Sequence, residues 1–152
     1  MQLMISRDLL LQAINLISKA ADKRHNMVIL GNMKLALTNT QLVMVASDLE
    51  LELQATLNLP ESACKQPGEI TVPANKFKDI VKLLPDGLPV SITVGDDKQC
   101  LIVCGSSRFK LSTLPAQDFP MLGEPEQVTP IQLPREALVD LLDKTHFAMA
   151  VQ

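Results

Sequence analysis

The sequence predicts an α+β fold built from a duplicated unit, with helices sharing an inner face and antiparallel sheets outside. Three stretches of the 152-residue chain, at residues 3–14, 70–81 and 131–142, carry one pattern of alternating apolar residues, a helix-start residue and an amphipathic helix. Three further strands are expected after each of the first two stretches. The order strand, helix, three strands therefore occurs twice, which is typical of two like units packed about a pseudo-twofold axis.

In the first unit we expect a strand over residues 2–5 and a helix over residues 7–20. Ser6 is a suitable N-cap, because its hydroxyl can accept a hydrogen bond from an unpaired N–H of the first turn. Strands are expected over residues 31–37, 42–46 and 49–59, the last because leucine or alanine alternates with polar residues. The apolar side of the helix is predicted to comprise Leu9, Leu10, Ala13, Ile14, Ile17 and Ala20.

In the second unit we expect a helix over residues 74–84, ended by a Pro-Asp-Gly turn, and strands over residues 90–94, 99–103 and 108–112. When the two helices are aligned at their start residues, apolar positions coincide. Leu10 matches Phe77 and Ile14 matches Val81. These matches predict two helices with equivalent buried faces.

The third unit begins near Val128, after a proline-punctuated segment over residues 114–125 that we expect to be a linker. It reaches Gln152 without its three strands. A strand and a helix alone cannot bury their apolar faces. We therefore expect a first domain over residues 1–125, an incomplete second domain over residues 126–152, and a chain that is part of a longer repeating protein.

The formal net charge of −3 argues against a simple nucleic-acid binder, but the charge is unevenly distributed. Residues 7–24 contain four basic and two acidic side chains, and residues 74–82 contain three lysines and one aspartate. The first two helical segments are thus basic within an acidic protein. Two interpretations are open: ordinary solvated helix faces, or one basic surface that faces nucleic acid.

Cysteine usage predicts a reducing, cytoplasmic setting. Cys100 and Cys104 lie four residues apart on an expected strand, a separation of roughly 13 Å that is too long for a disulfide. We expect buried thiols instead. The sequence has no apolar run near the roughly 20 residues of a membrane helix, and its start does not resemble a signal peptide.

Catalytic motifs are absent from the sequence: it has no P-loop, dinucleotide fingerprint, HExxH or GxSxG. One enzyme-like hypothesis remains. Asp48, Glu50 and Glu52 would share a face of the strand over residues 49–59, with neighbours about 7 Å apart, and could bind a divalent cation. The simpler interpretation is the wet face of an antiparallel strand, and we predict no metal site.

Residues 105–120 (GSSRFKLSTLPAQDFP) closely resemble the bacterial DNA polymerase III beta subunit family, the sliding clamps. The resemblance implies a DNA-clamp fold with three such domains per chain, and a homodimer closed head to tail into a ring. It also implies a processivity factor without catalysis or cofactor, which tethers the replicative polymerase to duplex DNA. Further matches in the same order are residues 29–32 (ILGN), 47–52 (SDLELE), 71–74 (TVPA), 76–77 (KF), 83–87 (LLPDG) and 147–152 (FAMAVQ).

The same resemblance implies which residues meet DNA. Arg24 and Gln152 match DNA-contacting residues of the family, and Lys82 lies where the family commonly has a basic residue facing the hole. Lys23 and Lys78 are expected near the same surface. Phosphate contacts of this kind carry no sequence information, so the predicted partner is duplex DNA of any sequence.

The resemblance also implies a dimer interface on the outer strand of the first domain. Arg108, Phe109 and Leu111 are assigned to it, with Lys76 nearby for charge pairing. The alternative is that Phe109 and Leu111 belong to the ordinary core. Because the partner surface is a third domain that this sequence lacks, we expect an exposed sheet edge that can self-associate.

Other implied partners are the replicative polymerase, the clamp loader and repair proteins, which bind a pocket between the second and third domains of the family. This pocket lies almost wholly outside the sequence, so we expect no binding of clamp-binding peptides and no membrane partner. Two other functions stay open: a metal-dependent enzyme that uses Asp48, Glu50 and Glu52, and a stand-alone β-rich scaffold without a DNA role.

Overall fold

The computed structural model describes residues 1–21, 27–95, 98–123 and 129–149. The chain divides into two compact units, Met1–Leu122 and Gly123–Gln152. Within the described residues, no helix is long and apolar enough to cross a membrane.

The predicted order of helices and strands in the first unit is confirmed, with three short additions, which are the strand β5 and the 3-10 helices η2 and η3. The three-residue strand β5 lies within residues 60–68, where only a loop was expected. The first half contains β1 (Gln2–Ser6), α1 (Arg7–Ile17), η1 (Ser18–Ala20), η2 (Val28–Gly31), β2 (Asn32–Leu37), β3 (Gln41–Ser47) and β4 (Glu52–Asn58). The second contains β5 (Cys64–Gln66), β6 (Gly68–Pro73), α2 (Ala74–Leu83), β7 (Pro89–Val94), β8 (Gln99–Cys104), β9 (Ser107–Ser112) and η3 (Ala116–Asp118).

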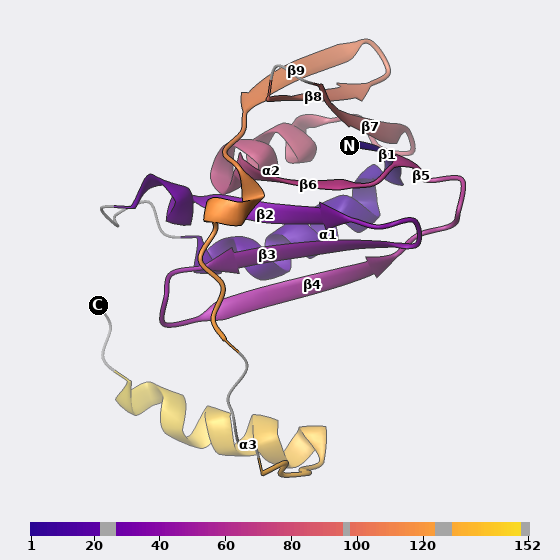
Figure 1. Ribbon diagram of the computed structural model, residues 1–152. Coiled ribbons are helices and arrows are strands. Elements are labelled where there is room, and N and C mark those ends of the chain that lie inside the picture. Colours follow the sequence, from indigo (N-terminus) through magenta and orange to yellow (C-terminus); the bar gives the residue numbers. More distant parts are fainter. Residues whose placement is uncertain (22–26, 96–97, 124–128, 150–152) are drawn as a thin grey trace. The chain divides into compact units, whose positions relative to one another are not determined.

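The two halves exchange their first strands. One sheet has the order β5-β1-β7-β8-β9, and the other has the order β4-β3-β2-β6 (Figure 1). Strand β1 pairs antiparallel with β7 of the second half, and β6 pairs antiparallel with β2 of the first. The expected pseudo-twofold relation between the halves therefore takes the form of a reciprocal strand exchange.

Helices α1 and α2 pack together, and their buried faces share one hydrophobic core with both sheets. The equivalent pairs Leu10/Phe77 and Ile14/Val81 are all completely buried, as predicted. Leu9 is half exposed (50%), so its place on the apolar side of α1 was wrong. Its side chain lies one helical position outside the buried stripe.

Ser6 precedes α1 with an extended backbone, but its side chain makes no capping hydrogen bond. The capping prediction was therefore wrong. Ser6 is still the last residue of β1, where it pairs with Pro89 of β7. Because β1 continues directly into α1, Ser6 keeps an extended backbone, and its side chain is exposed.

Strand β4 begins at Glu52, three residues later than expected. The preceding residues form a turn in which Oδ1 of Asp48 accepts hydrogen bonds from the backbone N–H groups of Glu50 (3.0 Å) and Leu51 (2.7 Å). Leu49 in this turn has a positive φ of 76°, which no strand accommodates. From Leu53 onward, the predicted alternation of half-buried and exposed residues is confirmed.

Residues 113–122, which we call the strap, cross the outer face of the β4-β3-β2-β6 sheet (Figure 1). Phe119 is buried in a second hydrophobic cluster with Ile29 and Val45, on the face of β3 opposite the main core. At the far end, the Leu122 N–H donates to Oε2 of Glu52 at 2.9 Å. The prediction of a linker from residue 114 was therefore wrong for this part of the segment.

The second unit contains α3 (Arg135–Thr145) and η4 (His146–Ala148). The strand expected before α3 is not formed: residues 129–134 have no regular structure. A strand requires a pairing partner, and the described residues of this unit supply none. No residue of α3 is buried, and its apolar side, which includes Leu138 and Leu142, is about half exposed.

Candidate nucleic-acid interface

Helix α2 presents lysines on the side that faces away from the core. Ala74, Phe77 and Val81 are buried on the core side of this helix, while Lys76 and Lys82 lie on the opposite side and are exposed. Asp79 is the acidic residue on this side. The outward side of α2 therefore carries a net positive charge.

Lys78 also lies on α2 but is half buried. Its Nζ donates a hydrogen bond of 3.1 Å to Oγ of Ser18, a buried residue of η1 just after α1. A lysine ammonium has three donors, so this contact leaves two for other acceptors. Lys78 therefore links the two helices and remains near the outward side of α2.

The described part of the first helical segment shows no basic surface; three of the six charged residues counted there, Asp22, Lys23 and Arg24, lie outside the described residues. The exposed positions of α1 include Asp8, Gln12, Asn15 and Leu16, and Lys19 follows in η1. One acidic and one basic residue leave this side without net charge. Among the described residues, the basic side of the helix layer is therefore that of α2.

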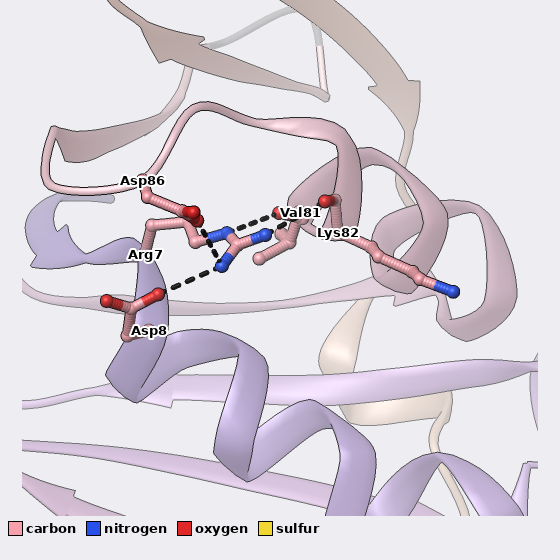
Figure 2. A network of polar contacts seen from close by, with 5 residues as sticks. All are labelled: Arg7, Asp8, Val81, Lys82 and Asp86. Carbon is pink, nitrogen blue, oxygen red and sulfur yellow. Dashed lines mark hydrogen bonds and ion pairs between the residues drawn. The ribbon is translucent and has the colours of Figure 1, made fainter.

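Arg7, counted as part of the first basic segment, is held in a network at the end of α2 (Figure 2). Its Nε donates to the carbonyl oxygen of Val81 (3.2 Å), and its Nη2 donates to that of Lys82 (2.9 Å). Its Nη1 contacts carboxylate oxygens of Asp8 (2.9 Å) and Asp86 (2.6 Å). Asp8 was already included in the charge count of residues 7–24, and Asp86 adds a second carboxylate, so the two together more than offset the charge of Arg7.

Sequence reasoning missed this arrangement, although a signal existed. The structure places the start of α1 beside the end of α2, a juxtaposition that a twofold axis running across the two helices would produce. Arg7 opens the first helix, and the Pro-Asp-Gly turn closes the second. An ion pair between Arg7 and Asp86 follows from that placement.

Three of the predicted DNA-contacting residues, Lys23, Arg24 and Gln152, lie outside the described residues. Lys78 and Lys82 lie on the same helix, four residues apart, which is one turn. The structure therefore brings together two of the five predicted contacts.

Strand β9, assigned to the dimer interface, ends the five-stranded sheet. Arg108 is exposed on it, Phe109 is partly buried against the core, and Leu111 is only 6% exposed. The alternative reading of Leu111 as a core residue therefore describes its place in this chain. Lys76 is carried by α2 rather than by this strand.

The geometry required for the metal hypothesis is not formed. Asp48 and Glu50 lie in the turn before β4 rather than on one strand face, and the Glu52 carboxylate accepts the Leu122 N–H. Across the described residues, no cluster of three or more His, Cys, Asp or Glu side chains could hold a metal ion.

The three cysteines, Cys64, Cys100 and Cys104, are free thiols. Cys100 and Cys104 are buried on β8, as predicted, and burial raises the pKa of Cys100 to about 12. Cys64 lies half buried on β5. A thiol with such a raised pKa is protonated at neutral pH and is a poor nucleophile or metal ligand.

The two exchanged sheets, backed by one helix layer, define a class of protein: the DNA-clamp fold. A solved sliding clamp (DNA polymerase III subunit beta) from Pseudomonas aeruginosa matches with a TM-score of 0.92 and 39% identity over all of this chain and 40% of its own. The solved beta sliding clamp of Caulobacter crescentus matches with a TM-score of 0.93 and 35% identity, again over all of this chain and 40% of its own.

Residues 1–123 match the family model of the N-terminal domain of the DNA polymerase III beta subunit, and the chain belongs to this family. The beta sliding clamp of Pseudomonas putida is 40% identical over 152 residues, which are 100% of this chain and 41% of that protein. The chain thus spans about two fifths of the length of the relatives it matches.

Proposed function

We propose that the chain supplies the first domain, and the start of the second, of a DNA sliding clamp. Such a clamp encircles duplex DNA as a head-to-tail homodimeric ring and keeps the replicative polymerase on its template without catalysis. Family membership supports this proposal. The observation that carries the proposal is the side of α2 that faces away from the core, which bears lysines. Among the described residues, it is the only outward side of a helix in the first unit that carries a net positive charge.

Lys82 is proposed to contact phosphates of DNA in the hole, together with Lys78, Lys23, Arg24 and Gln152. Lys82 is exposed at the end of α2, and Lys78 retains two donors beyond its bond to Ser18. A few such contacts bind duplex DNA without reading its sequence. Binding of this type is weak enough to permit sliding.

The ring is proposed to close through β9, with Arg108 and Phe109 facing the third domain of a second chain, Leu111 behind them in the same strand, and Lys76 pairing with an acidic partner. The position of β9 at the end of its sheet supports this role. Because Leu111 is buried within its own domain, its contribution would be to support Phe109 rather than to enter the interface itself.

The boundary between the first and second domains is proposed to lie between residues 125 and 126. The polymerase, the clamp loader and repair proteins would bind parts of the ring that these 152 residues do not encode. We place the protein in the cytoplasm, at the nucleoid, where replication takes place.

A hybrid ring tests the proposed function. Residues 1–122 would replace the corresponding first domain of the Pseudomonas aeruginosa clamp, which is 39% identical to this chain. Loaded onto nicked circular DNA, the hybrid should remain bound, and it should be lost when the circle is linearised, because only a closed ring depends on the topology of the DNA. The unmodified Pseudomonas aeruginosa clamp is the control. If it stays on the circular DNA and the hybrid does not, the proposal is contradicted.

A charge reversal separates the clamp from a β-rich scaffold without a DNA role. The hybrid carrying Arg24→Glu and Lys82→Glu should dissociate from DNA faster, and its salt dependence should be shallower. Equal retention of the reversed and unreversed hybrids would favour the scaffold.

A further inference from the structure

We propose that Arg7 is a positioning residue: it fixes the last turn of α2, and so the backbone of Lys82, without contacting DNA itself. This inference rests on the proposed function, in which Lys82 contacts phosphate. Figure 2 shows the network of Arg7 with Asp8, Val81, Lys82 and Asp86.

The guanidinium of Arg7 supplies donors that the end of α2 lacks. The last four carbonyl groups of a helix have no partners within the helix. Arg7 donates to two of them, through Nε to Val81 at 3.2 Å and through Nη2 to Lys82 at 2.9 Å. A cation in this position also interacts favourably with the negative end of the helix dipole. The side chain is only 15% exposed, so the contact is shielded from water.

The same guanidinium is a poor ligand for phosphate in this place. Its Nη1 is within 2.6 Å of Asp86 and 2.9 Å of Asp8, whose side chains are 81% and 58% exposed. An approaching phosphate would therefore meet two carboxylates before it reached Arg7. Like charges at that distance repel, and the pair of carboxylates already neutralises the arginine.

The backbone and the side chain of Lys82 have different roles in this proposal: the backbone is held by Arg7, and the side chain is free to contact phosphate. Its carbonyl oxygen is held by Arg7, while its ammonium group points away from the network (Figure 2). A lysine on a frayed helix end must order both backbone and side chain when it binds phosphate. With the backbone already fixed, only the side-chain torsions lose freedom, which lowers the cost of the contact.

The twofold repeat argues that this arrangement is specific to α2. The residue equivalent to Arg7 in the second half is Ala74, which is fully buried and cannot donate to the end of α1. Helix α1 instead passes into η1, where the Ser18 hydroxyl accepts from Lys78. The arginine cap therefore belongs to the helix whose outward side carries the lysines.

Binding of a short fluorescent duplex by the 152-residue chain, followed by anisotropy across a salt series, tests the proposal. The key variant is Arg7→Met with Asp86→Asn, which removes the cap and leaves the net charge unchanged. Lys82→Gln removes the contact, and the triple variant combines them. Lys110→Gln is the matched control, because Lys110 is exposed on β9 between Phe109 and Leu111 and faces away from the core.

Lys82→Gln should lower the slope of log affinity against log salt concentration by about 0.9, the value for one phosphate contact on duplex DNA. The Arg7→Met/Asp86→Asn variant should weaken binding, and the triple variant should bind like Lys82→Gln alone, with the same slope. A further loss of about 0.9 in the triple variant would show that Arg7 itself contacts phosphate. Unchanged binding by Arg7→Met/Asp86→Asn would show that Lys82 needs no support. Either result overturns the proposal.

Two further measurements distinguish a failure of the positioning role from a failure of the proposed function. Amide hydrogen exchange at Leu83 and Leu84 should accelerate in Arg7→Met/Asp86→Asn without any DNA present, and unchanged exchange would refute the positioning role. Arg7→Lys keeps the positive charge, but a single ammonium group cannot donate to two carbonyl groups and two carboxylates at once, as the planar guanidinium does. This variant should therefore bind DNA more weakly than the unmodified chain and more tightly than Arg7→Met/Asp86→Asn. If the unmodified chain and the hybrid ring both fail to bind duplex DNA, the proposed function falls, whatever the exchange shows.

Discussion

The side-chain amide of Asn32 donates a hydrogen bond of 2.9 Å to the hydroxyl of Thr71, and both residues are buried. The Thr71 hydroxyl in turn donates to the carbonyl oxygen of Leu114 at 3.1 Å. This chain of bonds joins β2 to the exchanged strand β6 and fastens the start of the strap. Within the described residues, no buried side-chain nitrogen or oxygen lacks a partner.

Thr71→Val should destabilise the first unit by about 1–3 kcal/mol, because it leaves the buried Asn32 amide without an acceptor, while the backbone N–H of residue 71 still donates to the Leu114 carbonyl oxygen. Thr71→Ser keeps the hydroxyl and should cost less. Urea denaturation of both variants measures the difference. Equal stability of the valine variant and the unmodified chain would show that the bond from Asn32 contributes nothing.

Phe119→Ala should reduce the free energy of unfolding by about 3–5 kcal/mol, because the side chain is 4% exposed in a cluster with Ile29 and Val45. Met121→Ala, on the same strap but 48% exposed, should change it by less than about 0.5 kcal/mol. Thermal or urea unfolding can compare them. Similar small effects would mean that residues 113–122 behave as a linker after all.

Two adjacent leucines of α1 provide a direct test of its orientation. Leu10→Ala should destabilise by about 2–5 kcal/mol, because Leu10 is fully buried. Leu9→Ala should have a small effect, since Leu9 is 50% exposed and alanine is a good helix former. Denaturant midpoints of the two variants decide; the reverse order would contradict the orientation described.

The three cysteines should react with a thiol reagent at different rates. Cys64 should be modified first, while Cys100 and Cys104 should react only as the domain opens, because both are buried. Mass spectrometry of partially alkylated protein identifies the order. Early modification of Cys100 in folded protein would contradict its burial.

Cys100 also predicts a pH dependence of stability. Burial raises its pKa from 9.0 to about 12, so the folded state holds the thiol proton where the unfolded state releases it. The contribution of the neutral thiol is complete below pH 9.0 and is lost as the pH rises toward 12. Cys100→Ala should therefore show a smaller loss of stability between pH 9 and pH 11 than the unmodified chain, measured by denaturant titration.

The parts of the fold that depend on local patterns could be predicted from the sequence. The burial of Leu10 and Phe77 follows from helical spacing, and the faces of β4 follow from alternation. The exchange of β1 and β6 could not be predicted, because a strand pattern does not specify which strand it pairs with. The late start of β4 depends on the Asp48 turn, whose hydrogen bonds compete locally with strand pairing.

The candidate site was predictable to a different extent. Periodicity places Lys82 on the outward side of α2, and resemblance gives it a role. The neutralisation of Arg7 could not be obtained from a count of charges, because it depends on Asp86, which is 79 positions later in the sequence. Burial of Leu111 likewise depends on how β9 packs against the core, and not on the strand pattern.

The exchange of first strands also constrains how the domain is made. Leu3 pairs with Ile92 and Ile5 pairs with Val90, so the earliest strand to be synthesised waits for one of the later ones. Until residue 94 has left the ribosome, β1 has no β7 to pair with and can meet only the short strand β5, although α1 can already pack against β3 and β4. The pairing of β1 with β7 must therefore wait while more than half of the domain is translated.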